Sequence, residues 1–285
     1  MGRRNKPAVQ KYHDRVARRY DASYEDAYWQ VHDALTWTYL KPHLPRDLAL
    51  PVLDLGCGTG KWGIKLLQSG FAVTFVDISG AMVERARAKV TELGLERRAA
   101  FVQADLGDLA ALPQGEFAFA AALGDPIGCA TSPARALKEI ARRLRPDGAL
   151  VATLDNKLAA LDYYLQAGSA DDMEAFLRNG RTHWLTKDEA EQFLIHTFTP
   201  QEAVRLFSTA GFTVVDLRGK TVLDFRKNQG VLADNAERRR WQRIEQRLSR
   251  DRDAVARAGH LQIAARLGGA APETSDRPDS TGASD

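Results

Sequence analysis

The stretch Pro51-Val52-Leu53-Asp54-Leu55-Gly56-Cys57-Gly58-Thr59-Gly60 decides the fold of this chain. Its apolar part, residues 52–55, is short and bounded by a proline and a glycine, as is typical of a buried parallel strand. Three glycines at alternate positions follow, and the spacing of Ile64 and Leu67 before Gly70 predicts a helix. The glycines therefore form a strand-to-helix turn where a ligand can approach bare backbone.

This turn is compatible with two kinds of nucleoside cofactor. Residues 58–63 satisfy the dinucleotide pattern G-x-G-x-x-G, which by itself is a weak signal. Asp54 argues against a dinucleotide, because its negative charge at the strand end would face a pyrophosphate. The same charge suits a ligand with an ammonium or sulfonium group. The sequence therefore favours S-adenosylmethionine (SAM) over NAD.

Two further predicted strands are followed by carboxylates. Residues 71–77 read as a buried strand closed by Asp77, about twenty residues after the glycines, where an acidic side chain accepts hydrogen bonds from ribose hydroxyls. Residues 99–103 form the next short strand, and Asp105 follows it. Because parallel strands end on one rim of a sheet, we expect Asp54, Asp77 and Asp105 to gather at the ligand site.

The stretch from Val52 to Gly60 resembles, almost residue for residue, the first motif of the class I SAM-dependent methyltransferases. The resemblance extends to about Leu217. It implies an α/β fold, a Rossmann-like, doubly wound, mostly parallel seven-stranded sheet with an antiparallel last strand. It also implies SAM as cofactor and S-adenosyl-L-homocysteine (SAH) as product, with Asp105 reading the adenine amino group. The cofactor-binding residues expected on this basis are Tyr20, Asp54, Gly56, Cys57, Gly58, Gly60, Asp77, Ile78, Met82, Asp105, Leu106 and Leu123; for Met82, core packing is an equally good interpretation.

The fourth predicted strand covers residues 117–123. The segment that follows it lies beside the methyl group of the cofactor in class I enzymes. DNA adenine methylases carry Asn-Pro-Pro-Tyr or Asp-Pro-Pro-Tyr there. This chain has Asp125-Pro126-Ile127-Gly128, without the second proline or the aromatic residue, which argues against a flipped nucleobase as substrate. Asp125 is a candidate catalytic base or cation-binding group; the alternative is a structural aspartate in a turn.

A second candidate catalytic residue, His183, lies in residues 156–196, which interrupt the alternation of strands and helices. We expect this segment to be an insertion that forms a lid over the substrate. His183 stands beside Trp184, and an imidazole titrates near neutral pH where an aromatic neighbour can exclude water. The alternative is a helical excursion packed on the sheet edge, with a solvated or hydrogen-bonded histidine.

The remaining pattern predicts five segments. Residues 1–45 form an N-terminal helical cap, with an aromatic stripe that includes Tyr24 and Tyr28 on a helix ended by Pro42. Residues 46–155 are the SAM-binding core, 156–196 the lid, and 197–267 complete the core. That last part contains a helical insertion at about 233–258, with Trp241, Ile244 and Leu248 on one stripe, before a final strand at 260–266. Residues 268–285 are expected to be disordered.

The composition of the chain limits the kinds of partner that it is expected to bind. The chain has 285 residues and a net charge of +3, from 40 basic and 37 acidic residues, so a polyanionic partner is not indicated. No apolar run is long enough for a membrane span, and the two cysteines do not indicate a disulfide framework. We expect a cytoplasmic protein with a small-molecule substrate and neither a nucleic-acid nor a membrane partner; monomer and homodimer both stay open.

The sequence thus favours transfer of the sulfonium methyl group to an O, N, C or S nucleophile of a small molecule by direct displacement, without a metal. Three alternatives stay open. An RNA methyltransferase is supported only by the arginine-rich segment 237–252, which also reads as a solvated helix face. The others are a non-catalytic protein that binds SAM or SAH, and an NAD oxidoreductase.

Overall fold

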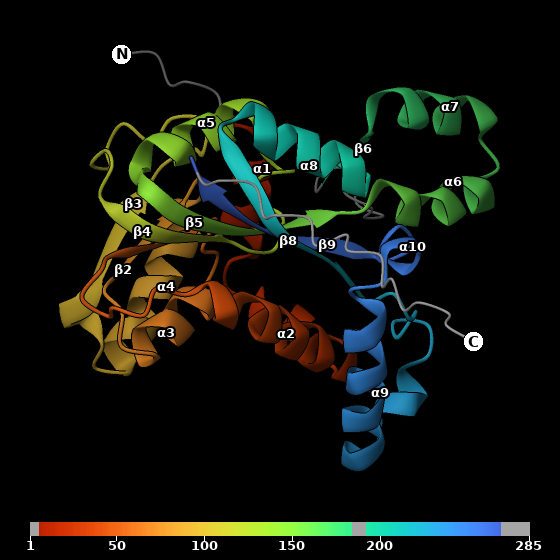
Figure 1. Ribbon diagram of the computed structural model, residues 1–285, viewed down its shortest axis with the longest axis horizontal. Helices are drawn as coiled ribbons and strands as arrows, with labels where there is room; N and C mark the ends of the chain where they lie inside the picture. Colours follow the sequence, from red (N-terminus) through yellow and green to blue (C-terminus); the bar gives the residue numbers. More distant parts are fainter. Residues whose placement is uncertain (1–5, 184–191, 269–285) are drawn as a thin grey trace, which may run out of the picture.

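The computed structural model describes residues 6–183 and 192–268 of the chain. Seven strands form the central sheet in the order β3-β2-β1-β4-β5-β9-β8 (Figure 1). Neighbouring strands are parallel from β3 to β5, whereas β9 runs antiparallel to both β5 and β8. The expected Rossmann-like sheet of seven strands with an antiparallel last strand is confirmed. The strands are β1 Val52–Leu55, β2 Val73–Asp77, β3 Ala99–Gln103, β4 Phe117–Ala122, β5 Leu144–Asp155, β8 Phe212–Lys220 and β9 His260–Leu267.

Helices cover both faces of this sheet (Figure 1). On one face, α2 (Ala27–Leu40), α3 (Lys61–Gln68) and α4 (Gly80–Glu92) pack on the strands through Leu40, Leu66 and Val90. On the other face, α5 (Pro133–Arg143) and α8 (Pro200–Thr209) contribute Ile140 and Phe207. Alternate strand residues point to opposite faces, so the central strands must be apolar throughout to fill both cores.

Polar side chains at the N-termini fix where several helices begin. Ser79 accepts a hydrogen bond from the backbone N–H of Met82 and caps the N-terminus of α4. Ser132 likewise accepts from the backbone N–H of Arg135 and caps α5, whose first residue is Pro133. Thr199 and Glu202 form a capping box at the start of α8. Each of these side chains replaces a missing intrahelical partner at a helix N-terminus.

The N-terminal part is built from α1 (Ala8–Val16), the 3-10 turn η1 (Asp21–Tyr24) and α2, which ends before η2 (Lys41–His43). The prediction that Pro42 ends the helix is confirmed. The extension of the aromatic stripe back to Tyr24 is wrong, because Tyr24 lies in η1 and α2 starts at Ala27, capped by Asp26. A capping side chain fixes where a helix starts, and apolar spacing alone does not show it.

Residues 156–196 contain η4 (Lys157–Ala160), α6 (Leu161–Ala167), α7 (Ala170–Asn179) and a two-stranded sheet of β6 (Arg181–His183) with β7 (Leu194–His196). In Figure 1, α6 and α7 project beyond the central sheet. The return strand β7 reaches the loop after β4, where the backbone N–H of His196 donates to Gly128 O across 2.9 Å. Trp184 lies outside the described residues.

Between β8 and β9 the chain forms η6 (Gln229–Leu232), α9 (Asn235–Leu248) and α10 (Arg252–Val255); another 3-10 turn, η3, spans Glu96–Arg98. Helices and a final strand were expected here. The stripe of α9 differs from the prediction, because Ile244 is 37% exposed and Glu245 is fully buried. Glu245 accepts hydrogen bonds from the N–H groups of Val222 and Leu223, which a charged side chain can satisfy and isoleucine cannot. The predicted disordered tail lies outside the described residues, apart from Gly268.

No helix within residues 6–183 and 192–268 is both long and apolar enough to cross a membrane.

Candidate functional site

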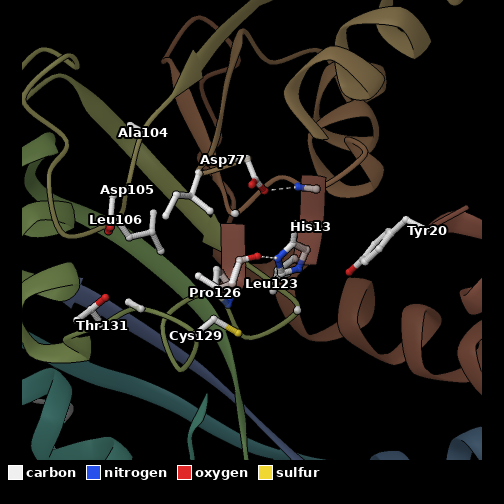
Figure 2. A pocket seen from close by; sticks show the side chains of 16 residues that line it. His13, Tyr20, Asp77, Ala104, Asp105, Leu106, Leu123, Pro126, Cys129 and Thr131 are labelled. Carbon is white, nitrogen blue, oxygen red and sulfur yellow. Dashed lines mark hydrogen bonds between the residues drawn. The ribbon is translucent and has the colours of Figure 1, made fainter. Parts of the chain in front are cut away.

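A cavity opens at the carboxyl ends of β1, β2 and β3 (Figure 2). Eight of the twelve residues predicted to bind the cofactor line it: Tyr20, Gly56, Gly58, Asp77, Ile78, Asp105, Leu106 and Leu123. The space enclosed, including the open mouth, is about 730 Å³, within the range of small-molecule sites. These residues are far apart in the sequence and meet because parallel strands end on the same rim.

The glycine loop after β1 forms one wall of the cavity. Gly56, Gly58 and Gly60 have φ of 64°, 53° and 91°, a region that other residues enter only with strain. At Gly56 a side chain is excluded outright, since a Cβ atom would lie 2.3 Å from Pro126 Cβ. At Gly58 the nearest atom to such a Cβ is Tyr20 Cε1 at 3.9 Å, so the space beside Gly58 belongs to the cavity.

Asp77 joins two walls of the site. Its Oδ2 accepts from Gly58 N–H and its Oδ1 from Ser79 N–H, each at 2.8 Å. Burial raises the pKa of Asp77, while these two N–H groups and His13 act in the opposite direction. Each carboxylate oxygen still has a lone pair for a ligand hydroxyl. Asp105 is similarly fixed by Gly107 N–H at 2.7 Å and also lines the cavity.

The N-terminal segment covers the cavity through α1 and η1. Asp14 on α1 accepts a hydrogen bond from Ser79 Oγ at 2.6 Å, and Asp21 in η1 accepts from Thr59 Oγ1 at 2.5 Å and from Lys89 Nζ at 2.6 Å. These bonds attach the cover to the loops after β1 and β2. They place His13 and Tyr20 at the cavity, as Figure 2 shows.

Four predicted cofactor residues lie outside the cavity lining. Asp54 is fully buried and accepts from Gly63 N–H at 2.8 Å; burial raises its pKa to about 7. Gly60 begins α3, Cys57 is buried in the core beneath the loop, and Met82 packs on Val16 and Ala17. A direct contact between any of these four and a cofactor stays a prediction. Asp54 in particular holds the first turn of α3 through Gly63.

The two predicted catalytic residues also lie outside the lining. Asp125 has φ 58°, and its carboxylate accepts from the backbone N–H groups of Gly128 at 2.8 Å and Asp155 at 3.1 Å. Burial, and then the nearby Asp155, raise the pKa of Asp125 well above its ordinary value. His183 is exposed on β6. The catalytic roles of Asp125 and His183 stay predictions. In the structure, the hydrogen bonds of the Asp125 carboxylate hold its own loop in shape.

Sequence reasoning missed several residues of the cavity, notably Val9, His13, Cys129 and Thr131. No local signal identifies Val9 and His13, because they reach the site through the docking of α1. Cys129 is a free thiol whose pKa is raised by burial. Cys129 follows the Asp125 turn, so its place shortly after β4 is the sequence signal that could have identified it as a cavity residue. None of the lining residues comes from the described part of the predicted lid, residues 156–183 and 192–196.

Comparisons with known proteins agree with this arrangement. A family described as a methyltransferase domain matches residues 52–148. The uncharacterized methyltransferase YodH of Bacillus subtilis (strain 168) is 32% identical over 101 residues, which are 35% of this chain and 41% of YodH. The tRNA 5-carboxymethoxyuridine methyltransferase of Escherichia coli (strain K12) is 27% identical over 164 residues, 56% of this chain and 61% of that enzyme.

The chain thus spans less than two thirds of the length of both these relatives. A solved structure of an S-adenosylmethionine-dependent methyltransferase from Mesorhizobium loti superimposes with a TM-score of 0.57 and 23% identity, over 81% of this chain and 96% of that one. At this identity the superposition shows a shared fold.

Proposed function

Because the chain belongs to the class I SAM-dependent methyltransferases, we propose that it transfers the methyl group of SAM to a nucleophilic atom of a small molecule by direct displacement. In this proposal residues 46–155 bind the cofactor and the N-terminal residues up to 45 cover it. SAM, when bound, supplies a methyl group already activated on a sulfonium. The protein's contribution is to align the two reactants and exclude water.

The charge of the cavity is the observation that carries this proposal. Asp77 and Asp105 line it, while no lysine or arginine from the described residues does. A dinucleotide would bring a pyrophosphate with no basic partner, whereas a cationic nucleoside meets the two carboxylates. The apolar Ile78, Leu106 and Leu123 offer surface for an adenine ring. The fit to SAM therefore rests on Asp77 and Asp105 instead of Asp54, which lies beneath the loop.

Isothermal titration with SAM, SAH and NAD tests the cofactor. We expect SAM and SAH to bind and NAD not to bind; tight NAD binding without SAM binding would overturn the proposal. Single-turnover transfer of labelled methyl from SAM to a panel of phenols, amines and thiols then tests catalysis. Binding of SAM without transfer to any acceptor would favour a non-catalytic SAM-binding protein.

A tRNA acceptor is the second candidate, favoured by the match to the E. coli tRNA enzyme and by the arginines of α9. Two of these arginines are engaged within the protein, because Arg238 donates to Leu232 O and Gln30 while Arg240 lies 3.7 Å from Glu237. We expect no mobility shift of bulk tRNA at moderate salt, since the net charge of the whole chain is only +3. A salt-sensitive shift would instead select the RNA substrate.

We also propose a reducing, cytoplasmic setting, which the free thiols of Cys57 and Cys129 support.

A further inference from the structure

A second polar cluster lies next to the cavity, at the carboxyl end of β5. Asp155 ends this strand, and His260 begins the neighbouring strand β9, with Nε2 at 3.6 Å from Asp155 Oδ1. The ring of His32 from α2 packs edge-on against His260, with centroids 5.2 Å apart. We call Asp155, His260, His32, Tyr24 and Tyr28 the β5 recess.

The side chains of Asp155 and His260 are partly accessible to solvent, although their pKa shifts indicate burial. Burial raises the pKa of Asp155 to about 6 and lowers the pKa of His260 well below its usual value, so protein surrounds both groups. Yet their side chains keep 31% and 24% of their surface accessible. Both groups are therefore largely surrounded by protein and still reachable from solvent.

The hydrogen bonds around His260 leave the Asp155 carboxylate without a donor. Thr221 Oγ1 donates its proton to Lys220 O at 2.6 Å, so towards His260 Nδ1, at 3.5 Å, it can only accept. On the other side of the ring, Nε2 of His260 faces the Asp155 carboxylate. No N–H or O–H group of the described residues donates to that carboxylate. A carboxylate that keeps 31% of its side-chain surface accessible and lacks a donor is a place for a hydrogen-bond donor from outside.

The recess shares walls with the cofactor cavity. The backbone N–H of Asp155 donates to Asp125, which stands between the cavity-lining residues Gly124 and Pro126. On the other side, the ring centroid of Tyr24 lies 4.8 Å from that of Tyr20, which also lines the cavity. These two contacts link the recess to the cavity.

The remaining wall is aromatic and carries one guanidinium. Trp29 packs against Tyr24 and Tyr28 with centroid distances of 4.6 and 5.0 Å. Arg226 lies over the Tyr28 ring at 4.7 Å. A planar ligand finds rings to pack on here, and positive charge to stabilise a developing anion.

We propose, building on the methyltransferase activity proposed above, that the β5 recess binds an aromatic methyl acceptor through its hydroxyl group, with Asp155 as general base and His260 as a positioning residue. As the hydroxyl oxygen bonds to the methyl carbon, the carbon–sulfur bond breaks and its electron pair stays on sulfur. The hydroxyl proton moves to Asp155 Oδ1, which lies 3.6 Å from Nε2 of His260. Arg226 offsets the negative charge that develops on the oxygen.

Charged and titratable groups from several elements face this pair. They are Tyr28 and His32 from α2, Tyr24 from η1, Asp125 and Cys129 from the loop after β4, and Lys220 and Arg226 from β8 and the loop after it. Lys220 and Arg226 lower the pKa of Asp155, but burial outweighs them. A carboxyl that ionises at about pH 6 is a suitable base near neutral pH. The transfer rate should therefore rise with pH through this region.

The test uses Asp155→Asn and His260→Gln in the full-length protein, with phenols graded in acidity from 4-methoxyphenol to 4-nitrophenol. The initial rate of labelled methyl transfer is measured at pH 8 with saturating SAM, and SAH affinity is measured in parallel. For 4-methoxyphenol we expect Asp155→Asn to be about 100-fold slower, the usual contribution of a general base. For 4-nitrophenol, already ionised at this pH, we expect a loss of less than about threefold, since no proton must be removed.

Asp216→Asn is the matched control. It removes a carboxylate on β8, outside the recess, whose Oδ2 lies 3.5 Å from His43 Nε2 and accepts from Arg218 Nε at 2.8 Å. It should leave all rates unchanged. An equal loss for every phenol, or no loss, would overturn the role of Asp155. A wild-type protein that binds SAH and methylates amines or thiols but no phenol would overturn the acceptor class and leave the proposed function standing. A loss of SAH binding in Asp155→Asn would place Asp155 in the cofactor site or in the folding core and overturn the proposal.

Discussion

Asp77 Oδ2 accepts a hydrogen bond from Gly58 N–H across 2.8 Å, which joins the end of β2 to the glycine loop that follows β1. The other oxygen of the same carboxylate holds Ser79, the N-cap of α4. One buried side chain thus fixes the loop and the start of a helix on either side of the cavity. The two N–H groups hold the Asp77 carboxylate in place, and its negative charge strengthens both hydrogen bonds.

Asp77→Asn should weaken SAH binding by about 100-fold, because an amide can accept only one of the two backbone hydrogen bonds, and hydrogen bonds to charged groups contribute about 1.5–3 kcal/mol. Isothermal titration measures the effect. Asp108→Asn, at an exposed carboxylate that accepts only from Ala110 N–H at 3.3 Å, is the control and should bind SAH normally. Equal affinity in all three proteins would remove Asp77 from the site.

Gly58→Ala and Gly56→Ala should separate binding from folding. At Gly58 there is room for a methyl group in the cavity, so the substitution should cost about 1 kcal/mol of stability for the positive φ and block SAH binding. At Gly56 the Cβ would collide with Pro126, and the melting temperature should fall much further. Thermal unfolding with and without SAH measures both. An SAH-induced stabilisation of Gly58→Ala equal to that of the wild type would contradict this assignment of the cavity.

Asp21→Asn should lower SAH affinity about tenfold by loosening the cover. Asp21 holds η1 against Thr59 and Lys89, and its pKa is lowered by their hydrogen bonds, although burial opposes them. The side chain is 39% exposed, so solvent screens the ion pair and global stability should change little. Titration with SAH and thermal unfolding report the two effects separately. A large fall in melting temperature would show instead that the clamp serves folding.

Lys220→Met should stabilise the protein, and more at pH 7 than at pH 9.5. Lys220 is fully buried, and burial lowers its pKa from 10.5 to about 7. Between these values the unfolded chain binds more protons than the folded one, so wild-type stability rises with pH through this window. The methionine variant lacks that rise. At ~1.4 kcal/mol per pKa unit, its advantage should shrink by about 1–3 kcal/mol.

Urea unfolding at both pH values measures the Lys220→Met difference. Lys11→Met, at an exposed position, is the control and should show no change with pH. A constant difference between wild type and Lys220→Met would mean that Lys220 keeps its ordinary pKa.

The sequence by itself determined the sheet and the cofactor rim. Short apolar strands, helix caps and glycine turns are local signals, and parallel strands bring Asp77 and Asp105 to one edge without further information. The caps at Ser79, Ser132 and Thr199 could be predicted for the same reason.

Only the tertiary structure decided which side chains turn into the site. Asp54 faces Gly63 beneath the loop, because neighbouring residues of a strand point to opposite faces and α3 covers its face. His13 reaches the cavity through the docking of α1, and Asp155 meets His260 because β9 pairs with β5. These contacts depend on how distant elements pack, and residue spacing along the chain does not encode them.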